Sequence, residues 1–557
     1  MADAIGRRPF LIGALTAPLS GACARQVAPP EAPSGPALGQ ADQPVQLAGG
    51  GRWNVTELGA APDGQTDCSA ILAEALSRVE AGGGGTLVFP SGVYLTGPLK
   101  LVSNLTLWLE AGSVLKFRDD FDSYLPMVPM RWEGTEVVGF SPLLYADGIE
   151  NVSIRGRGYI DGRGHSWWSF FLGLKSEYQK TGKYPTDSKW QQEFLRANPG
   201  LEKKADDPSR LLMGFLRPPL IQLRNSKNIL IEGVTLQNSP FWTINPVGCD
   251  NLTVTGVTIR NPEDGPNTDG INPESCSNVH ISNCHIDVGD DCITIKSGRD
   301  TEGRRLGRPA ESYTIANSTM LRGHGGVVIG SEMSGSVRKI VITNCTFDGT
   351  DRGIRVKSTR GRGGVVEEMR VSNIVMKNIR QQALVLNMFY TDAPPEPVSE
   401  RTPSFRNIHV SGVTGHAEQA GLLLGLPENP LTDVSLSDIN LVSKHGLVIK
   451  DARDIALRGV RVDAHEGPAI SAERVENLEL EAVGSLTPQS DAATLKLVDV
   501  EHAYVHDCFV ARPTKVFMSV EGEKSQGILL ADSYLARAEK PVELAPGLGK
   551  MAVTYQK

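Results

Sequence analysis

The sequence lacks a surplus of basic residues, a dense set of cysteines and a long apolar run. Its 557 residues include 56 Lys and Arg against 64 Asp and Glu, a net charge of −8, so nothing indicates a nucleic-acid partner. Eight cysteines are too few for a disulfide scaffold in a chain of this length. No stretch has the roughly 18 consecutive apolar residues of a membrane-spanning helix. With 40% hydrophobic residues the chain can bury a large core, which excludes a mainly disordered protein.

The N-terminal residues predict an export signal followed by a tether. Arg7 and Arg8 precede an apolar run and a small-residue cleavage pattern, an order typical of twin-arginine signals. We expect residues 1–24 to be the signal and residues 25–50, rich in Ala and Pro, to be a flexible tether. The protein is then periplasmic or secreted. A lipid anchor at Cys23 is one alternative, and a frayed N-terminal helix is another.

One short pattern recurs along the chain and predicts a solenoid. A β-branched strand is followed by Gly, Asn or Asp and a second alternating strand, and most repeats are 21 to 39 residues apart. Examples begin at Asn228, Asn251, Asn278 and Asn477. Repeats of 20 to 50 residues built from short strands indicate stacked coils, and variable spacing indicates loops of variable length on one face. We therefore predict an all-β fold, a parallel β-helix, as a single domain over residues 51–557.

Two segments depart from this repeat. Residues 51–118 read as a cap region, in which apolar residues at helical spacing over 69–81 predict a short helix that covers the N-terminal end of the core. An independent small domain is the alternative. The longest repeat spacing is 77 residues, so residues 157–217 form an inserted loop that projects from the stack. The regular coils over 226–450 follow it.

Four consecutive coils align without gaps, and their alignment stacks acidic residues. The aligned segments begin at Gly270, Cys292, Gly326 and Gly353. Because stacked strands lie ~5 Å apart, Asp269 should lie over Asp291, and Asp290 over His324. Adjacent side chains of a regular strand point to opposite faces, so Gly289 is expected to permit the bend that turns both neighbouring aspartates into one cleft.

This cluster indicates acid–base chemistry on an anionic sugar. Three carboxylates this close repel one another, so a purely structural role would need a compensating cation. In glycoside hydrolysis one protonated carboxyl donates to the leaving oxygen while an ionised one activates water. Arg355 and Lys357, two residues apart on one exposed face, form a cationic pair for a uronate carboxylate. We therefore expect an anionic polysaccharide or oligogalacturonide as substrate, with no cofactor and no metal.

Two other functions remain open at this point. Clustered carboxylates also suit Ca²⁺, and a calcium-dependent uronate lyase would follow from such a site. A non-catalytic glycan-binding β-helix is the second, although it has no need of three adjacent aspartates. Tyr390 lies on the coil after Arg355, placed either to stack on a sugar or to form an exposed aromatic rim.

The motifs of these coils resemble those of the glycoside hydrolase family 28 polygalacturonases, bacterial branch. The four motifs are Asn267-Thr-Asp-Gly, Gly289-Asp-Asp, Gly323-His-Gly and Arg355-Val-Lys, in the family's order, within a resemblance that covers about residues 53–450. The resemblance implies a right-handed β-helix and hydrolysis of α-1,4-galacturonan with inversion. Rhamnogalacturonan and xylogalacturonan hydrolases share the fold, so the backbone type stays open.

The resemblance also implies roles for individual residues. By motif position Asp290 would be the general acid, Asp269 and Asp291 would hold the nucleophilic water, and His324 would tune the acid. The substrate-binding residues would be Asn267, Arg355, Lys357 and Tyr390. In one departure, Met320 stands where many fungal members have a Cys bridged to the residue matching Cys292, so that bridge is absent here. Finally, an insertion just before Asp269 would close one end of the groove, from which we expect exo action.

Overall fold

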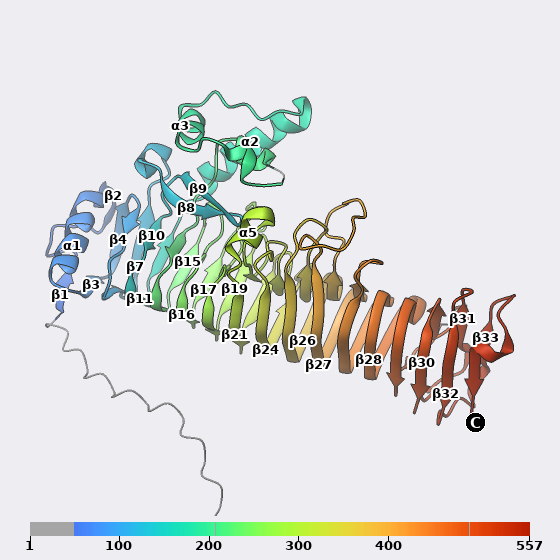
Figure 1. Cartoon of the computed structure of the whole chain (residues 1–557). Coiled ribbons are helices and arrows are strands. Elements are labelled where there is room, and N and C mark those ends of the chain that lie inside the picture. Colours follow the sequence, from blue (N-terminus) through green and yellow to red (C-terminus); the bar gives the residue numbers. More distant parts are fainter. Residues whose placement is uncertain (1–49, 207, 490, 557) are drawn as a thin grey trace, which may run out of the picture. The chain divides into compact units, whose positions relative to one another are not determined.

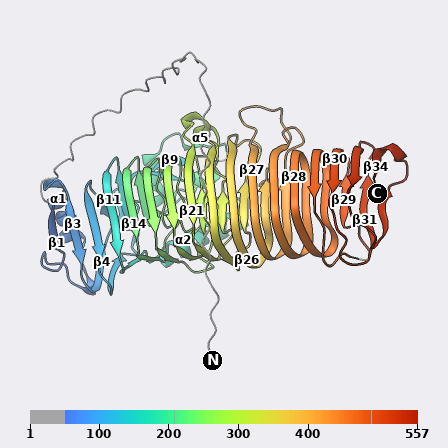
Figure 2. The same cartoon turned by 90° about the horizontal axis from the view of Figure 1, so that it is seen from below.

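The structure is a computed structural model and describes residues 50–206, 208–489 and 491–556. The predicted export signal and all but the last residue of the predicted tether lie outside these residues. Within them, 29 strands join one sheet, and Figures 1 and 2 show these strands stacked one behind another. The pairings within the stack are parallel, as for Leu107 with Ile154 and Ile154 with Ile231. This architecture confirms the predicted right-handed parallel β-helix.

Short strands separated by turns or bends make up most of the coils. The N-terminal coils contain β1 (Gly51–Asn54), β2 (Asp63–Asp67), β3 (Gly85–Phe89), β4 (Gly92–Thr96), β5 (Leu99–Lys100), β6 (Leu105–Leu109) and β7 (Ser113–Phe117). Next come β10 (Leu144–Asp147), β11 (Glu150–Gly156), β12 (Tyr159–Asp161), β13 (Ile221–Arg224), β14 (Lys227–Glu232), β15 (Thr235–Gln237), β16 (Asp250–Thr255), β17 (Thr258–Arg260), β18 (Ser277–Ser282) and β19 (His285–Val288).

The later coils have longer strands that bend from one face to the next. They contain β20 (Ile293–Ile295), β21 (Ala310–Ala316), β22 (Thr319–Arg322), β23 (Val327–Ile329), β24 (Val337–Asp348), β25 (Ile354–Lys357), β26 (Val365–Asn387), β27 (Ser404–Leu424) and β28 (Leu431–Glu481). The last strands are β29 (Leu495–Val498), β30 (Glu501–His506), β31 (Thr514–Glu521), β32 (Gln526–Ala531), β33 (Ala538–Leu544) and β34 (Val553–Tyr555).

The core is a ladder of inward-facing aliphatic side chains. Period-two alternation sends every second side chain of each strand inward, and the coil register places these residues directly above one another. One such column contains Leu107, Ile154, Ile231, Val254, Ile281, Ile315, Ile342, Val371, Val410 and Leu436, all buried. Burying each of these side chains is worth about 1.5–3 kcal/mol, so the repeat itself stabilises the stack.

The recurring asparagines of the repeat occupy left-handed turns. Asn104, Asn151, Asn228 and Asn251 have φ of 57°, 59°, 55° and 55°, a region that Asn tolerates better than most residues other than glycine. Their side chains also bond from coil to coil: Asn151 Nδ2 donates to Asn104 Oδ1 at 2.8 Å, and Asn251 Nδ2 donates to Asn228 Oδ1 at 2.8 Å. The repeat therefore needs Asn for both its backbone and its side chain.

A helix covers the N-terminal end of the stack. Helix α1 (Ser69–Ala81) buries Leu72, Ala75, Leu76 and Val79 and packs against β3, β4 and β5. Its bounds are those that the apolar spacing predicts. Figure 1 shows it at the blue end of the β-helix, which confirms the predicted capping helix.

The long spacing in the repeat contains helices. The segment 157–217 begins with β12, which pairs with β7 and β15 as part of the coil. It continues with α2 (His165–Thr181), α3 (Lys189–Ala197), η2 (Leu201–Lys203) and α4 (Ser209–Leu212); we call residues 165–217 the helical insertion. Figure 1 shows α2 and α3 on the same side of the coils as the hairpin of β8 (Val128–Trp132) and β9 (Thr135–Gly139). No helix in the described part of the chain is long and apolar enough to cross a bilayer.

Aromatic packing anchors the helical insertion in the main core. The ring of Trp167 on α2 lies 4.5 Å from that of Phe121, and Phe170 lies 4.3 Å from Phe215. Phe215 in turn lies 5.5 Å from Phe140, which belongs to the polypeptide just after β9. Trp167 is fully buried, and this aromatic cluster is continuous with the aliphatic ladder.

Candidate active site

The coil register brings the predicted acidic residues together. Ile271 bridges to Ile293, and β20 pairs with β23 so that Ile293 lies opposite Val327. The same register puts Asp269 beside Asp291: the amide of Gly270 donates to the carbonyl of Asp291 at 3.0 Å. One carboxylate oxygen from each of Asp269, Asp290 and Asp291 lies within 4.8 Å of the other two. Three carboxylates therefore meet at one point of the surface, as the ungapped alignment predicts.

At Gly289 there is no room for a side chain. A Cβ at this position would lie 2.6 Å from the carbonyl oxygen of Pro262 and 2.8 Å from those of Glu263 and Gly265. Its φ is not in the left-handed region. The glycine thus lets the loop before Asp269 pack directly on the chain before Asp290.

Each aspartate has a different environment. Asp290 Oδ1 lies 2.9 Å from His324 Nδ1. Asp291 is buried, and its Oδ2 accepts a hydrogen bond from Lys357 Nζ at 2.8 Å. The same carboxylate has a second cation at 3.8 Å, Nη1 of Arg355. Asp269 is also buried, and no described protein group hydrogen-bonds its Oδ1.

These environments shift the pKa values of Asp269 and Asp291 in opposite directions. Burial, reinforced by the charge of Asp290, raises the pKa of Asp269 well above its usual value. Burial opposes ionisation of Asp291 too, but Lys357, Arg355 and Lys296 together outweigh it and lower the pKa of Asp291 to about 2. The hydrogen bond with Asp290 raises the pKa of His324 to about 9. At neutral pH the site thus holds one carboxyl that resists ionisation and one carboxylate that resists protonation.

The predicted substrate-binding residues lie around the same carboxylates. Arg355 and Lys357 belong to β25, and their cationic groups lie 5.5 Å and 5.2 Å from the ring centre of Tyr390. This contact joins Tyr390 to the cationic pair. Asn267 lies on the loop before Asp269, and its Oδ1 accepts a hydrogen bond from Arg217 Nη2 at 2.8 Å. The structure thus brings together all eight residues singled out from the sequence.

A buried ion pair beneath the cluster carried no assignment from the sequence. Lys296 Nζ donates to Glu332 Oε2 at 2.8 Å and lies 4.7 Å from the ring centre of Trp242. Its positive charge also favours ionisation of Asp291. The alignment of Lys296 with Lys357 in the coil repeat could have indicated a role for Lys296. Glu332 lies in a loop after β23, and no feature of the sequence indicated a role for it.

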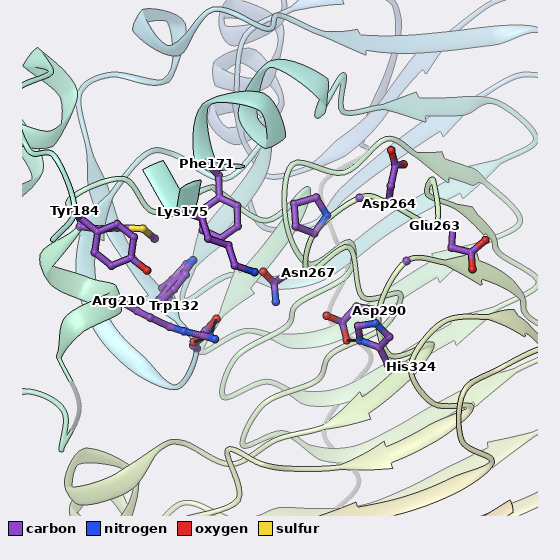
Figure 3. Close-up of a pocket in the computed structure, with 15 residues that line it drawn as sticks. Trp132, Phe171, Lys175, Tyr184, Arg210, Glu263, Asp264, Asn267, Asp290 and His324 are labelled. Carbon is purple, nitrogen blue, oxygen red and sulfur yellow. Dashed lines mark hydrogen bonds and ion pairs between the residues drawn. The ribbon is translucent and has the colours of Figure 1, made fainter. Parts of the chain in front are cut away.

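Two hollows meet at Asp290. The smaller, of about 100 Å³, is lined by all three aspartates together with Lys357 and Tyr390. The larger, of about 330 Å³, contains Asp290 but neither of the other two aspartates, and Figure 3 shows the side chains that line it. Its lining includes Trp132 before the β8–β9 turn and residues of the helical insertion, namely Phe171, Lys175, Tyr184, Arg210 and Met213. The insertion residues lie outside the repeat, so no register predicted them.

Arg217, at the end of the helical insertion, supports the loop of Asn267. It is buried, and its guanidinium lies 4.0 Å from the ring centre of Phe171 on α2. Besides Asn267, it donates to the carbonyl of Pro240 at 2.9 Å and to that of Pro266. No carboxylate in the described residues forms an ion pair with it. Arg217 therefore links α2, through the Phe171 ring, to the loop that contains Asn267, through neutral hydrogen-bond acceptors.

Cys292 behaves as the departure from the fungal pattern predicts. Its thiol is buried and free, and Met320 pairs with Ile286 of the neighbouring coil. The chain between the carboxylates and His324 is therefore held by the strand ladder.

Comparison with known proteins agrees with this geometry. The family model for glycosyl hydrolases family 28 matches residues 212–457. A probable polygalacturonase of Vitis vinifera is 30% identical over 398 residues, which are 70% of this chain and 74% of that protein. An endo-polygalacturonase of Pectobacterium carotovorum subsp. carotovorum is 28% identical, over 65% of this chain and 80% of its own length. The crystal structure of a hyperthermoactive exopolygalacturonase from Thermotoga maritima superposes with a TM-score of 0.64 at 34% identity, covering 74% of this chain and 91% of that one. The chain belongs to glycosyl hydrolase family 28.

Proposed function

We propose that this protein hydrolyses the α-1,4-galacturonosyl linkages of polygalacturonate, with Asp290 as general acid. The observation that carries the proposal is a cluster of three carboxyls in which Asp269 resists ionisation and Asp291 resists protonation, with Asp290 between them in the lining of both hollows. A chain that occupies both hollows would place its glycosidic oxygen beside Asp290. Membership of the family and the names of its relatives support the substrate.

The bond cleavage then follows from the positions of the groups. Asp290 donates its proton to the leaving glycosidic oxygen as the bond from that oxygen to the anomeric carbon breaks. A water held by Asp269 and Asp291 forms the new bond to the anomeric carbon and gives its proton to the ionised Asp291. His324, bonded to Asp290, orients the acid. Arg355 and Lys357 neutralise the carboxylate of the sugar bound next to them.

Inversion at the anomeric carbon is part of this proposal, although the spacing of the carboxyls is unusual for it. Inverting enzymes commonly separate the two carboxyls by roughly 6.5–9.5 Å, whereas here oxygens of all three lie within 4.8 Å. The water would lie beside the acid, between Asp269 and Asp291. Proton NMR of the first product anomer tests this: a β-anomer is expected from an α-linkage, and an initial α-anomer would contradict it.

We also propose exo action. Trp132, Phe171 and Tyr184 line the larger hollow, and the proposal requires that the helical insertion block the groove there, so that no longer chain can pass. Early digestion of polygalacturonate should release mono- or digalacturonate with little loss of viscosity. A rapid fall in viscosity with a ladder of longer oligomers would show internal cleavage. Rhamnogalacturonan and xylogalacturonan, assayed in parallel, test the backbone preference.

A calcium-dependent lyase is the second candidate, because the three aspartate oxygens are close enough to hold one cation. Lys357 competes with such an ion for Asp291, which favours the hydrolase. Export from the cytoplasm belongs to the proposal as well, supported by the Arg7-Arg8 signal pattern and by a polymeric substrate of plant cell walls. Cell fractionation of the full chain against a variant with both arginines replaced by lysine tests it.

A further inference from the structure

The part of the larger hollow that the helical insertion lines contains two basic side chains, Lys175 and Arg210. Phe171 and Lys175 lie four residues apart on α2, a spacing that places them on one face of the helix. Both line the hollow, and Figure 3 shows the Lys175 side chain extending past the Phe171 ring toward Asn267. No carboxylate in the described residues lies within ion-pair distance of Lys175 Nζ. Its charge is therefore free for a ligand.

Two of the carboxylates that line this hollow, Glu133 and Glu263, are paired with arginines. Glu133 accepts hydrogen bonds from both Arg210, at 3.1 Å, and Arg299, at 3.0 Å, and Arg299 has a second partner in Asp300 at 3.3 Å. Glu263 is paired with Arg380 at 2.6 Å. In Figure 3 the carboxylates of Glu263 and Asp264 lie to the right of Asn267, whereas the Lys175 side chain lies to its left. The insertion side thus keeps a surplus of positive charge.

A second positive charge lies at the same end, although it does not line the hollow. Beneath the hollow, the buried guanidinium of Arg217 has only neutral acceptors, one of which is Asn267. Two cations without a carboxylate partner, Lys175 and Arg217, therefore flank the Phe171 ring. A volume of about 330 Å³ lies at the lower end of the range for small-ligand sites, which suits a chain terminus.

We propose that Lys175, assisted by Arg210, binds the free carboxylate of the terminal uronate in the blind hollow, and so selects chains whose end residue is not methyl-esterified. This rests on the proposed function. Lys175 lines only the larger hollow, whereas Lys357 lines only the smaller one and Arg210 lines both. The Phe171 and Trp132 rings provide the apolar wall against which the sugar packs. Release of each terminal sugar then depends on prior de-esterification of that sugar.

The test uses three substrates: trigalacturonate, and the same trimer with a single methyl ester on one end residue or on the other. For wild-type protein, kcat/KM should fall about tenfold or more for one of the two esterified trimers, as expected for the loss of a charge-assisted contact. Lys175→Met should reduce that discrimination to less than about threefold, by losing rate only on the free acid. Lys175→Arg should keep it.

Lys180 provides the matched control, because it lies on the same helix, is exposed and pairs with Glu177 at 3.9 Å. Lys180→Met should discriminate as wild type does. Equal rates of wild type on all three trimers, or unchanged discrimination in Lys175→Met, would overturn the proposal for Lys175 while leaving galacturonan hydrolysis intact. Failure of wild type to cleave any galacturonan would overturn the proposed function and this inference together.

Discussion

Removing the ammonium group of Lys357 should move the acidic limb of the pH–rate profile. Lys357 Nζ lies 2.8 Å from Asp291 Oδ2, and both side chains are almost fully buried, at 8% and 2% exposure. The pKa of Asp291 is about 2 instead of the ordinary 3.8, a difference of ~2.5 kcal/mol in favour of the ionised form. This margin exists in spite of burial, and Lys357 is the largest contribution to it.

In Lys357→Met, burial opposes ionisation of Asp291 with only Arg355 and Lys296 left to counter it. The pKa should rise by roughly one to three units, the usual effect of one close opposite charge. In the proposed mechanism Asp291 must be ionised to accept a proton from water, so activity should be lost as the pH falls through its pKa. In wild type Asp291 becomes protonated only near pH 2, so we expect other groups to determine the acidic limb of the pH–rate profile. In the variant Asp291 should determine this limb, which should move to higher pH.

The measurement is kcat/KM for a short oligogalacturonide across the acidic range, which reports on the free enzyme. Lys357→Arg, which keeps the charge, should leave the limb near its wild-type position. Lys450→Met removes an exposed lysine that pairs with Glu473 at 2.7 Å, and should not change the profile. A Lys357→Met enzyme with lower activity but an unshifted acidic limb would refute the role given to this ion pair.

Four further outcomes are expected. Asp290→Asn should lower kcat roughly 10²- to 10⁴-fold through loss of the proton donor, and turnover within threefold of wild type would remove Asp290 from that role. Enzyme treated with a chelator should stay active and form saturated products; loss of activity that Ca²⁺ restores would favour the lyase. Asp269→Asn should be more thermostable than wild type by a margin that grows with pH, because a buried carboxyl with a raised pKa loses stability as the pH rises through that pKa; equal melting temperatures at all pH values would contradict this. The backbone amide of Cys249 lies 3.4 Å from the Sγ atom of Cys276. Both cysteines should nevertheless be free thiols in peptide maps, because stacked strands hold their Cβ atoms farther apart than the ~3.8 Å of a disulfide.

The coils that contain the aspartates could be predicted from the sequence, because residues that align between successive repeats of a solenoid lie next to each other in the structure. Once the segments at Gly270 and Cys292 align without a gap, Asp269 must lie one strand spacing from Asp291. The aliphatic ladder enforces that register, since a slip by one residue would turn the whole inward set outward. The ion pair between Lys357 and Asp291 does not follow from this rule, because Lys357 is in register with Lys296 and reaches Asp291 only through its long side chain.

The helical insertion follows no such rule. The coil repeat contains no residue that aligns with Lys175, Arg210 or Arg217. Their positions depend on how α2 and α4 pack over the β8–β9 hairpin. Gly289 illustrates a subtler difference: its need was predicted as a bend, whereas the structure requires it for close contact with the carbonyls of the neighbouring loop. Tyr390 was left between two interpretations, and the structure places it against the cationic pair.

The aromatic cluster beneath α2 determines how this enzyme can be re-engineered. Trp167 and Phe215 pack into the same hydrophobic interior as the coils, so excising the helices to open the groove would leave a large apolar hole and release the loop that Arg217 holds. The helices and the catalytic coils should melt in one cooperative transition, and partial proteolysis should not yield a trimmed, active solenoid. Converting the proposed terminal attack into internal attack would therefore need smaller side chains in the wall of the larger hollow, for example at Phe171 and Tyr184, with the buried aromatic cluster left in place.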